Sequence, residues 1–239
     1  MRIEALGVAG SPAPDRLTTC FRLSGGIVLD TGAAAHVIPP ERRDEIETIL
    51  LSHSHLDHTL GLPFLLGKHP VRVLGPAEAL AAVRGSLLDG RIWPDLSAHA
   101  FWSAISPGDR LDCGPWQIEV GATSHTIPCL SFLFRGGSGA VAVVGDTRLD
   151  PGVVEWVASR RPTRCIVEAS YPDSNAAVAR GYGHQTPADL RAWREALGPD
   201  CALCVTHMKP AYEAAVRAEC ESLGDPNLHI LQDGDVLPI

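Results

Sequence analysis

The sequence predicts an α/β protein in which two β-sheets pack against each other and helices cover their outer faces. Short apolar runs separated by Gly, Pro and Asp recur along the chain and indicate strands. Amphipathic or alanine-rich stretches lie between these runs in both halves and indicate helices. Because no low-complexity linker or short-period repeat interrupts the pattern, we expect one domain over residues 1–239.

The predicted elements are shared between the two halves of the chain. In the first half, strands are predicted at 2–8, 18–23, 27–29, 48–51 and 71–74, and a helix at 76–88, which begins with a proline. In the second half, strands are predicted at 116–122, 130–134, 140–144, 165–167 and 202–206, with helices near 153–159, 187–197 and 212–223. Residues 87–107 contain Trp93, Phe101 and Trp102 and several breakers, and are predicted to be irregular, either a lid over a pocket or an aromatic-capped loop.

The composition limits what the protein can bind. Hydrophobic residues make up 45% of the chain, so a disordered protein is not expected. The net charge of −8, from 20 Lys and Arg against 28 Asp and Glu, argues against a surface that holds a long polyphosphate chain. We therefore expect a compact ligand and no stable complex with nucleic acid. No apolar stretch approaches the roughly 20 residues needed to cross a bilayer, so no membrane segment is expected.

The N-terminal residues and the cysteines predict a cytoplasmic protein. Arg2 and Glu4 place charges where a secretory signal needs an apolar run. The seven cysteines are odd in number and scattered through apolar runs, which fits free thiols in a reducing compartment. Cys201 and Cys204 have a spacing typical of zinc sites, but no second pair accompanies them, so we expect buried structural thiols.

A dense group of metal-ligand side chains follows the strand predicted at 48–51. His53, His55, Asp57 and His58 supply four candidate ligands within six residues. On an extended strand His53 and His55 would point to the same side and share one ion. If the chain turns after His55, Asp57 and His58 reach a second ion. Mixed imidazole and carboxylate ligands favour zinc, with iron, manganese or cobalt as alternatives.

Further ligands have to come from distant parts of the chain. Four candidates follow apolar runs at the far end of a predicted strand, where a site can open: Asp30, His125, Asp146 and His207. Taken alone, each would more often be a turn or capping residue. The cluster of ligand-type residues at 53–58 favours a role as metal ligands instead. Four other histidines lack such support and are predicted to be surface or structural residues: His36, His69, His99 and His229.

The cluster at 53–58, with these four distant residues, resembles the full motif set of the metallo-β-lactamase superfamily, and the resemblance spans almost the whole chain. It implies an α/β (α+β) fold, the four-layer αββα sandwich, with two metal ions at one edge of the sheets. The implied ligands are His53, His55 and His125 for the first ion, and Asp57, His58 and His207 for the second. Asp146 would bridge the two ions, and Asp30 would orient the ligand loop.

Two further stretches resemble the phosphodiesterase branch of this superfamily, whose fold alone does not select a reaction. They are Val167-Glu168-Ala169-Ser170-Tyr171 and Gly183-His184-Gln185-Thr186-Pro187. In that branch a glutamate after a strand orients a histidine that opens a helix. The resemblance therefore implies that Glu168 orients His184, and that His184 contacts the phosphate or protonates the leaving oxygen.

Two subfamilies share these stretches, the tRNA 3′-processing endonucleases and the class II cyclic nucleotide phosphodiesterases. Three features are similar to the second: Arg91-Ile92-Trp93-Pro94-Asp95 resembles its lid, Thr206-His207-Met208-Lys209-Pro210 resembles its last motif, and Gly61-Leu62-Pro63 follows the cluster. The long Gly-rich or basic arm that grips tRNA in the first subfamily is not found in this sequence.

The predicted function is a hydrolase with two divalent ions, zinc first and Mn²⁺ or Fe²⁺ as alternatives. It would convert a cyclic nucleotide such as 3′,5′-cyclic AMP to the nucleoside monophosphate through a metal-bridging hydroxide. Asp57, Asp146, His184 and Glu168 would serve catalysis, and Trp93 would stack on the base, contributing ~1–3 kcal/mol. The alternatives are an RNA 3′-end endonuclease and a non-catalytic metal-binding sensor on the same fold. Dimers are common in this group, which points by analogy to a homodimer.

Overall fold

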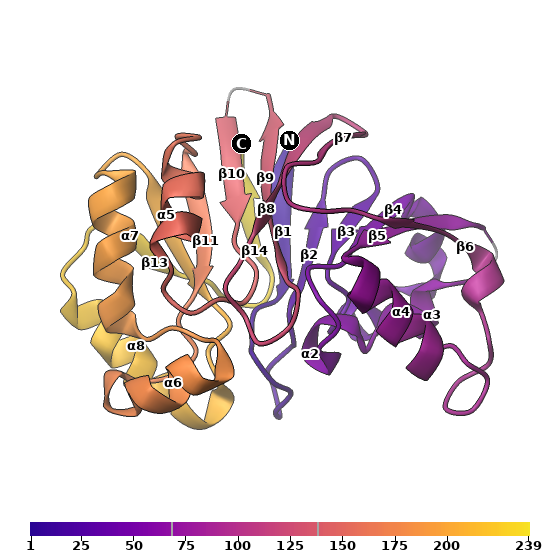
Figure 1. Ribbon diagram of the computed structural model, residues 1–239, viewed down its shortest axis with the longest axis horizontal. Helices are drawn as coiled ribbons and strands as arrows, with labels where there is room; N and C mark the ends of the chain where they lie inside the picture. The colour runs from indigo at the N-terminus through magenta and orange to yellow at the C-terminus, as the bar shows by residue number, and fades with distance from the viewer. Residues whose placement is uncertain (68, 138) are drawn as a thin grey trace.

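Two seven-stranded sheets face each other, and helices cover the outer surface of each sheet (Figure 1). The structure is a computed structural model, and it describes residues 1–67, 69–137 and 139–239. The four-layer αββα architecture expected from the sequence is confirmed. Within the described residues, no helix is long and apolar enough to cross a membrane.

The first sheet has the strand order β14-β1-β2-β3-β4-β5-β6. Its strands are β1 (Arg2–Gly7), β2 (Cys20–Leu23), β3 (Ile27–Leu29), β4 (Thr48–Leu50), β5 (Val71–Gly75), β6 (Ala100–Ala104) and β14 (Asp235–Pro238). The helices on this side are α1 (Ala34–Val37), α2 (Leu56–Thr59), α3 (Leu62–Leu65) and α4 (Ala77–Ser86). The last strand, β14, pairs with β1, so this sheet joins the two ends of the chain.

The second sheet has the strand order β13-β12-β11-β10-β9-β8-β7. Its strands are β7 (Arg110–Cys113), β8 (Trp116–Ala122), β9 (Leu130–Gly136), β10 (Gly139–Val143), β11 (Arg164–Glu168), β12 (Ala202–Thr206) and β13 (Leu228–Ile230). The helices outside it are α5 (Pro151–Ala158), α6 (Ala176–Tyr182), α7 (Leu190–Leu197) and α8 (Glu213–Ser222). The strands β10 to β13 run parallel, which brings their C-terminal ends to one edge.

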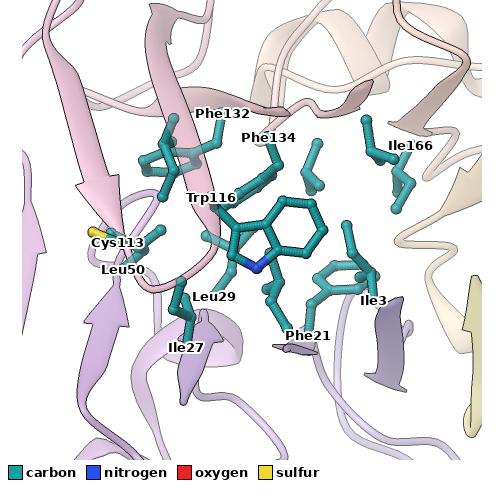
Figure 2. Close-up of a cluster of buried hydrophobic side chains, with 14 of the residues drawn as sticks. Ile3, Phe21, Ile27, Leu29, Leu50, Cys113, Trp116, Phe132, Phe134 and Ile166 are labelled. Carbon is teal, nitrogen blue, oxygen red and sulfur yellow. The ribbon is translucent and has the colours of Figure 1, made fainter. Parts of the chain in front are cut away.

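The space between the two sheets is filled by a hydrophobic core (Figure 2). Trp116, Phe132 and Phe134 of the second sheet meet Ile3 and Phe21 of the first, and all five side chains are buried. Burial of each such side chain stabilises the fold by ~1.5–3 kcal/mol. This packing holds the strands of both sheets in place, and with them the residues that follow the strand ends.

The prediction that residues 87–107 are irregular was wrong in part. Strand β6 lies within this segment and pairs parallel with β5. It forms an edge of its sheet, so Phe101 is 65% exposed and Trp102 is only half-buried. An edge strand of this kind lacks the continuous apolar run that marks a strand buried on both faces, and the pattern was missed for that reason.

Candidate metal centre

The candidate ligands lie where strands of both sheets end at one edge of the sandwich. His125, Asp146 and His207 come shortly after β8, β10 and β12 of the second sheet. Asp30 follows directly after β3 of the first sheet, and Glu168 is the last residue of β11. The structure therefore places these candidate residues at strand ends, as the sequence predicts.

The four clustered residues lie in the loop after β4 and in α2, which follows that loop. Strand β4 ends at Leu50, so His53 and His55 lie beyond it and not on a strand as predicted. Both nevertheless belong to one group of ligand atoms, which agrees with the prediction that they point to the same side. His55 immediately precedes α2, whose first turn contains Asp57 and His58. The chain therefore turns at His55, as the sequence analysis proposed for the second pair.

The side chains form three groups of ligand atoms, and the atoms of each group lie within 4.8 Å of one another. One group, made of Asp146, His184 and His207, shares residues with the other two. Those two groups consist of His53, His55, His125 and Asp146, and of Asp57, His58 and His207. Asp146 reaches both, because its Oδ2 lies 3.7 Å from Nε2 of His53 and its Oδ1 lies 3.5 Å from Nε2 of His58. The arrangement can hold metal ions in two neighbouring places joined by one carboxylate.

The donor atoms fit divalent cations. The Nε2 atom of His53 is buried and has no hydrogen-bond partner among the described residues. Leaving such an atom unpaired costs ~1–3 kcal/mol, and a bound cation would offset this cost. Nε2 of His125 lies 3.1 Å from Nδ1 of His55, and the Nε2 atoms of His58 and His207 are also 3.1 Å apart. Two unprotonated ring nitrogens repel at this distance unless a cation lies between them, and imidazole with carboxylate suits zinc, iron and manganese.

Asp30 and Ser52 orient the rings of the ligand loop. Oδ2 of Asp30 lies 2.8 Å from Nδ1 of His58. The same carboxylate accepts hydrogen bonds from the backbone nitrogen of Ser52 at 2.8 Å and from its Oγ at 2.7 Å. Ser52 Oγ in turn lies 3.0 Å from Nδ1 of His53. These contacts hold the Nε2 atoms of both histidines toward Asp146, and such outer contacts tune metal affinity.

Replacing Asp30 by asparagine should therefore weaken metal binding about 10- to 100-fold without unfolding the chain. Asn has one acceptor oxygen and an NH2 donor, so it cannot accept the hydrogen bonds from Ser52 and His58 that the two carboxylate oxygens of Asp30 accept. The measurement is a competition titration of zinc against a chromogenic chelator, with Asp112→Asn, an exposed carboxylate on β7, as the matched control. Equal affinities for the two variants would contradict the role of Asp30.

Burial and neighbouring charges set the protonation of the ligands. Burial lowers the pKa of His53, His55 and His125, which favours the neutral imidazole that binds metal. Burial acts the same way on His58, but the adjacent carboxylates, Asp146 first, raise its pKa well above the usual value. A cation bound beside Asp146 would replace that proton, so metal binding here is coupled to proton release.

His184 and Glu168 form a pair beside the two groups. Nδ1 of His184 lies 3.0 Å from both carboxylate oxygens of Glu168 and 3.9 Å from Oδ2 of Asp146. Glu168 is itself held by hydrogen bonds from the backbone nitrogen of Thr147, at 2.8 Å, and from Oγ of Ser170. Burial opposes a charge on His184, but Glu168 raises its pKa. With Nδ1 occupied by Glu168, Nε2 is the nitrogen that can deliver a proton.

The backbone at His207 is strained and closely packed. His207 has a φ of 63° and Asp30 a φ of 53°, a left-handed conformation that costs ~1–3 kcal/mol in residues with a Cβ. The backbone nitrogen of His207 donates to the carbonyl of Val8 at 2.7 Å. Gly10 approaches so closely that a Cβ there would lie 2.5 Å from the His207 carbonyl oxygen. The N-terminal segment therefore fixes a ligand far along the chain.

Gly183 positions His125, a role that no sequence pattern indicated. Its carbonyl lies 2.9 Å from Nδ1 of His125, and its φ is 77°. A Cβ at this position would lie 2.7 Å from the same Nδ1 atom. The ring of His125 therefore depends on the absence of a side chain at residue 183.

The variant Gly183→Ala should displace His125, lower zinc occupancy and destabilise the fold by ~1–2 kcal/mol through its left-handed backbone. The measurements are zinc content after dialysis and the thermal midpoint. Gly181→Ala is the control, because nothing lies within 4 Å of a Cβ added there. Full zinc occupancy in Gly183→Ala would show that His125 is not held in this way.

The remaining predicted residues lie outside the ligand groups. Trp93 is 38% exposed and packs against Phe64 of α3, with ring centroids 4.6 Å apart, so its role in substrate binding stays a prediction. The four unsupported histidines are exposed, as predicted: His36, His69, His99 and His229. Cys201 and Cys204 are buried free thiols, also as predicted.

Lys209 is a charged residue of the site to which the sequence analysis gave no role. Its Nζ lies 3.5 Å from Oδ2 of Asp57 and donates a hydrogen bond to the carbonyl of Gly10. Lys209 lies within the stretch 206–210, which resembles the last motif of the cyclic nucleotide phosphodiesterases. The signal that could have drawn attention to it is its place two residues after His207.

The fold and its paired ligand groups define a metallo-β-lactamase-type protein. A family model described as the β-lactamase superfamily domain matches residues 25–208, and the chain belongs to this family. The relatives include enzymes named as hydrolases and ribonucleases, in agreement with the predicted class of metal-dependent hydrolase.

Three similar proteins cover most or all of the chain. Ribonuclease Z from Bradyrhizobium diazoefficiens is 24% identical over 248 residues, which cover 80% of this chain and 81% of that protein. The metallo-β-lactamase-fold protein YhfI from Bacillus subtilis superposes with a TM-score of 0.78 at 20% identity, over 99% of both chains. Unliganded yeast PDE1 also superposes with a TM-score of 0.78, at 18% identity over 100% of this chain and 99% of that one. Ribonuclease J from Mycolicibacterium smegmatis matches over 112 residues, which span 19% of its length.

Proposed function

We propose that the protein is a two-metal phosphodiester hydrolase whose substrate is a cyclic nucleotide. The observation that carries the proposal is the His184–Glu168 pair, which lies 3.9 Å from the carboxylate shared by the two ligand groups. A proton donor held next to a dinuclear metal site is what cleavage of an unactivated phosphodiester needs, since the departing alkoxide is a poor leaving group.

In this proposal His53, His55 and His125 would hold the first ion, and Asp57, His58 and His207 the second. Asp146, which approaches His53 and His58, would contribute to both. Zinc is the first choice, with Mn²⁺ or Fe²⁺ as alternatives. Bound there, two ions would supply an activated water and neutralise the charge of the phosphoryl oxygens.

The protein's own residues account for the rest of the chemistry. Glu168 holds Nδ1 of His184 and favours its protonated form, so His184 can donate a proton from Nε2 to the leaving oxygen. Lys209 places a positive charge beside Asp57, which favours an anionic substrate at this edge of the sandwich. In this proposal Asp57, Asp146, Glu168 and His184 serve catalysis.

A small substrate is favoured over RNA by the charge of the chain. The net charge of −8 repels an extended polyanion, whereas one cyclic phosphodiester needs only the local charge of the site. The second candidate, an RNA 3′-end endonuclease, is supported by the similarity to ribonuclease Z over 80% of this chain.

The test is product analysis with the zinc- or manganese-loaded protein, given cyclic AMP and a precursor tRNA under matched conditions. Formation of AMP at a rate well above that of tRNA cleavage supports the proposal, and the reverse supports the endonuclease. Absence of hydrolysis of both substrates, and of bis(p-nitrophenyl) phosphate, would instead support a metal-binding sensor.

The proposal also includes a cellular compartment and an oligomeric state. The seven cysteines are free, which suits a reducing cytoplasm. By analogy with its group we propose a homodimer, which analytical ultracentrifugation would detect as a species of twice the 25.4 kDa chain mass.

A further inference from the structure

Two tyrosine rings, Tyr171 and Tyr212, lie in a row beside His184. The rings of Tyr171 and His184 have centroids 5.9 Å apart, and those of Tyr171 and Tyr212 are 5.5 Å apart. Tyr182 ends α6, two residues before His184. Residues from two separate segments therefore bring phenol rings to the side of the site where we place the proton donor.

Two of these rings are fixed by the same loops that build the metal centre. Tyr171 directly follows Ser170, whose Oγ donates to Glu168 and whose backbone nitrogen donates to the carbonyl of Gln185 at 3.0 Å. The backbone nitrogen of Tyr212 donates to the carbonyl of Lys209 at 2.8 Å. The backbone that carries both rings is therefore tied to the segments that carry the catalytic groups.

Neither ring is fully buried, and Tyr212 packs in part against the hydrophobic cluster outside the second sheet. Tyr171 and Tyr212 are both half-buried, and Tyr182 is 63% exposed. Burial, together with the neighbouring phenols, raises the pKa of Tyr171, so it stays a neutral ring. A half-buried neutral phenol offers an open face on which a flat group can stack.

Charge and aromatic surface together specify a ligand. The Nζ atom of Lys209 lies 3.5 Å from Oδ2 of Asp57, so a positive charge stands beside the metal centre. An anionic group at the metal centre would therefore lie next to Lys209, with the tyrosines beside it on the His184 side. A molecule with a phosphate and a planar ring a few bonds apart matches this pattern.

We propose that Tyr171 and Tyr212 bind the planar ring of the substrate group whose oxygen leaves phosphorus. The inference rests on the proposed function and deepens it, because it assigns the substrate class as phosphodiesters whose leaving side carries an aromatic ring, such as a nucleobase. It also places that ring on the side of the second sheet, away from Trp93 and its partner Phe64 in α3.

The test compares cyclic AMP with 3′,5′-cyclic ribose phosphate, the same ring system without a base, on the metal-loaded protein. The variant Tyr171→Leu should raise KM for cyclic AMP about 10-fold, as expected for loss of one stacked ring. The values of kcat and zinc content should not change, and neither should kcat/KM for the base-free substrate. Tyr171→Phe, which keeps the ring, should behave like the unmodified protein.

A binding measurement separates this inference from turnover. Calorimetric titration with AMP and with ribose 5-phosphate should show that Tyr171→Leu weakens only the first, by a similar factor. Phe101→Leu, on the exposed face of edge strand β6, is the matched aromatic control and should alter neither ligand.

The outcomes distinguish the inference from the function it rests on. If the unmodified protein hydrolyses neither substrate, the proposed function fails. If it hydrolyses both and Tyr171→Leu leaves their ratio unchanged, or if Trp93→Leu changes that ratio in its place, the function stands and the inference is overturned.

Discussion

Replacing Asp146 by alanine should remove metal from both ligand groups and lower phosphodiester hydrolysis about 10³-fold or more. The carboxylate of Asp146 approaches ligand atoms of both groups, at 3.7 Å from Nε2 of His53 and 3.5 Å from Nε2 of His58. Loss of the several kcal/mol that metal ions contribute to transition-state stabilisation corresponds to this factor.

The same variant should also upset the electrostatic balance of the site. Burial alone would favour a protonated Asp146, but the charges of His207 and His58 keep its pKa well below the usual value. Without the carboxylate, those imidazoles lose the negative charge that compensates bound cations.

The measurement is elemental analysis of the purified variant alongside its rate with cyclic AMP. The unmodified protein should carry two ions per chain, and Asp146→Ala fewer than one. Asp112→Ala, which removes an exposed carboxylate on β7, controls for the change in net charge and should retain both ions. A variant at position 146 that kept two ions would contradict the shared-ligand role.

The fold was predictable where strands are buried on both faces. Runs such as those in β10, β11 and β12 are continuously apolar because the sheets lie between layers, and their helices carry clear amphipathic patterns. Strands at the edges were missed, including β6 and the C-terminal β14, whose burial alternates. The pairing of β14 with β1 depends on residues more than 200 positions apart, which no local pattern records.

The site was predictable from chemistry at strand ends, and its supporting residues were not. His125 and His207 were identified because ligand-type side chains follow apolar runs beside a dense histidine cluster. Ser52, Ser170 and Gly183 carry no such signal, since a serine or glycine at a loop position has many ordinary uses. Their importance lies in contacts, such as the carbonyl of Gly183 at 2.9 Å from Nδ1 of His125, that only the folded chain creates.

The strained backbone at Asp30 and His207 connects the packed core to the candidate metal centre. Each residue follows directly after a strand and adopts positive φ, which turns the chain sharply at the sheet edge. The cost of ~1–3 kcal/mol at each position is borne by the packed core beneath, which fixes the strand ends. Core packing therefore supports the geometry of the candidate metal centre directly.

Replacing His184 by alanine should lower hydrolysis of cyclic AMP about 10²- to 10⁴-fold while metal content stays the same. We assign His184 to neither ion, although its ring forms a third candidate ligand group with Asp146 and His207. Unchanged metal content would therefore show that the variant has lost a proton donor, and a lost ion would show that His184 is a ligand. The pair with Glu168, at 3.0 Å, is what keeps the proton on the ring, so Glu168→Gln should show a smaller loss of the same kind.

The identity of the leaving group decides between the two roles considered for His184. A ribose alkoxide needs a proton as it departs, whereas p-nitrophenolate is stable without one. If His184 donates that proton, His184→Ala should lose far less activity on bis(p-nitrophenyl) phosphate than on cyclic AMP, and His36→Ala, an exposed histidine, should lose none on either. Equal losses on both substrates would assign His184 to holding the phosphate, because that contact is made whatever group departs.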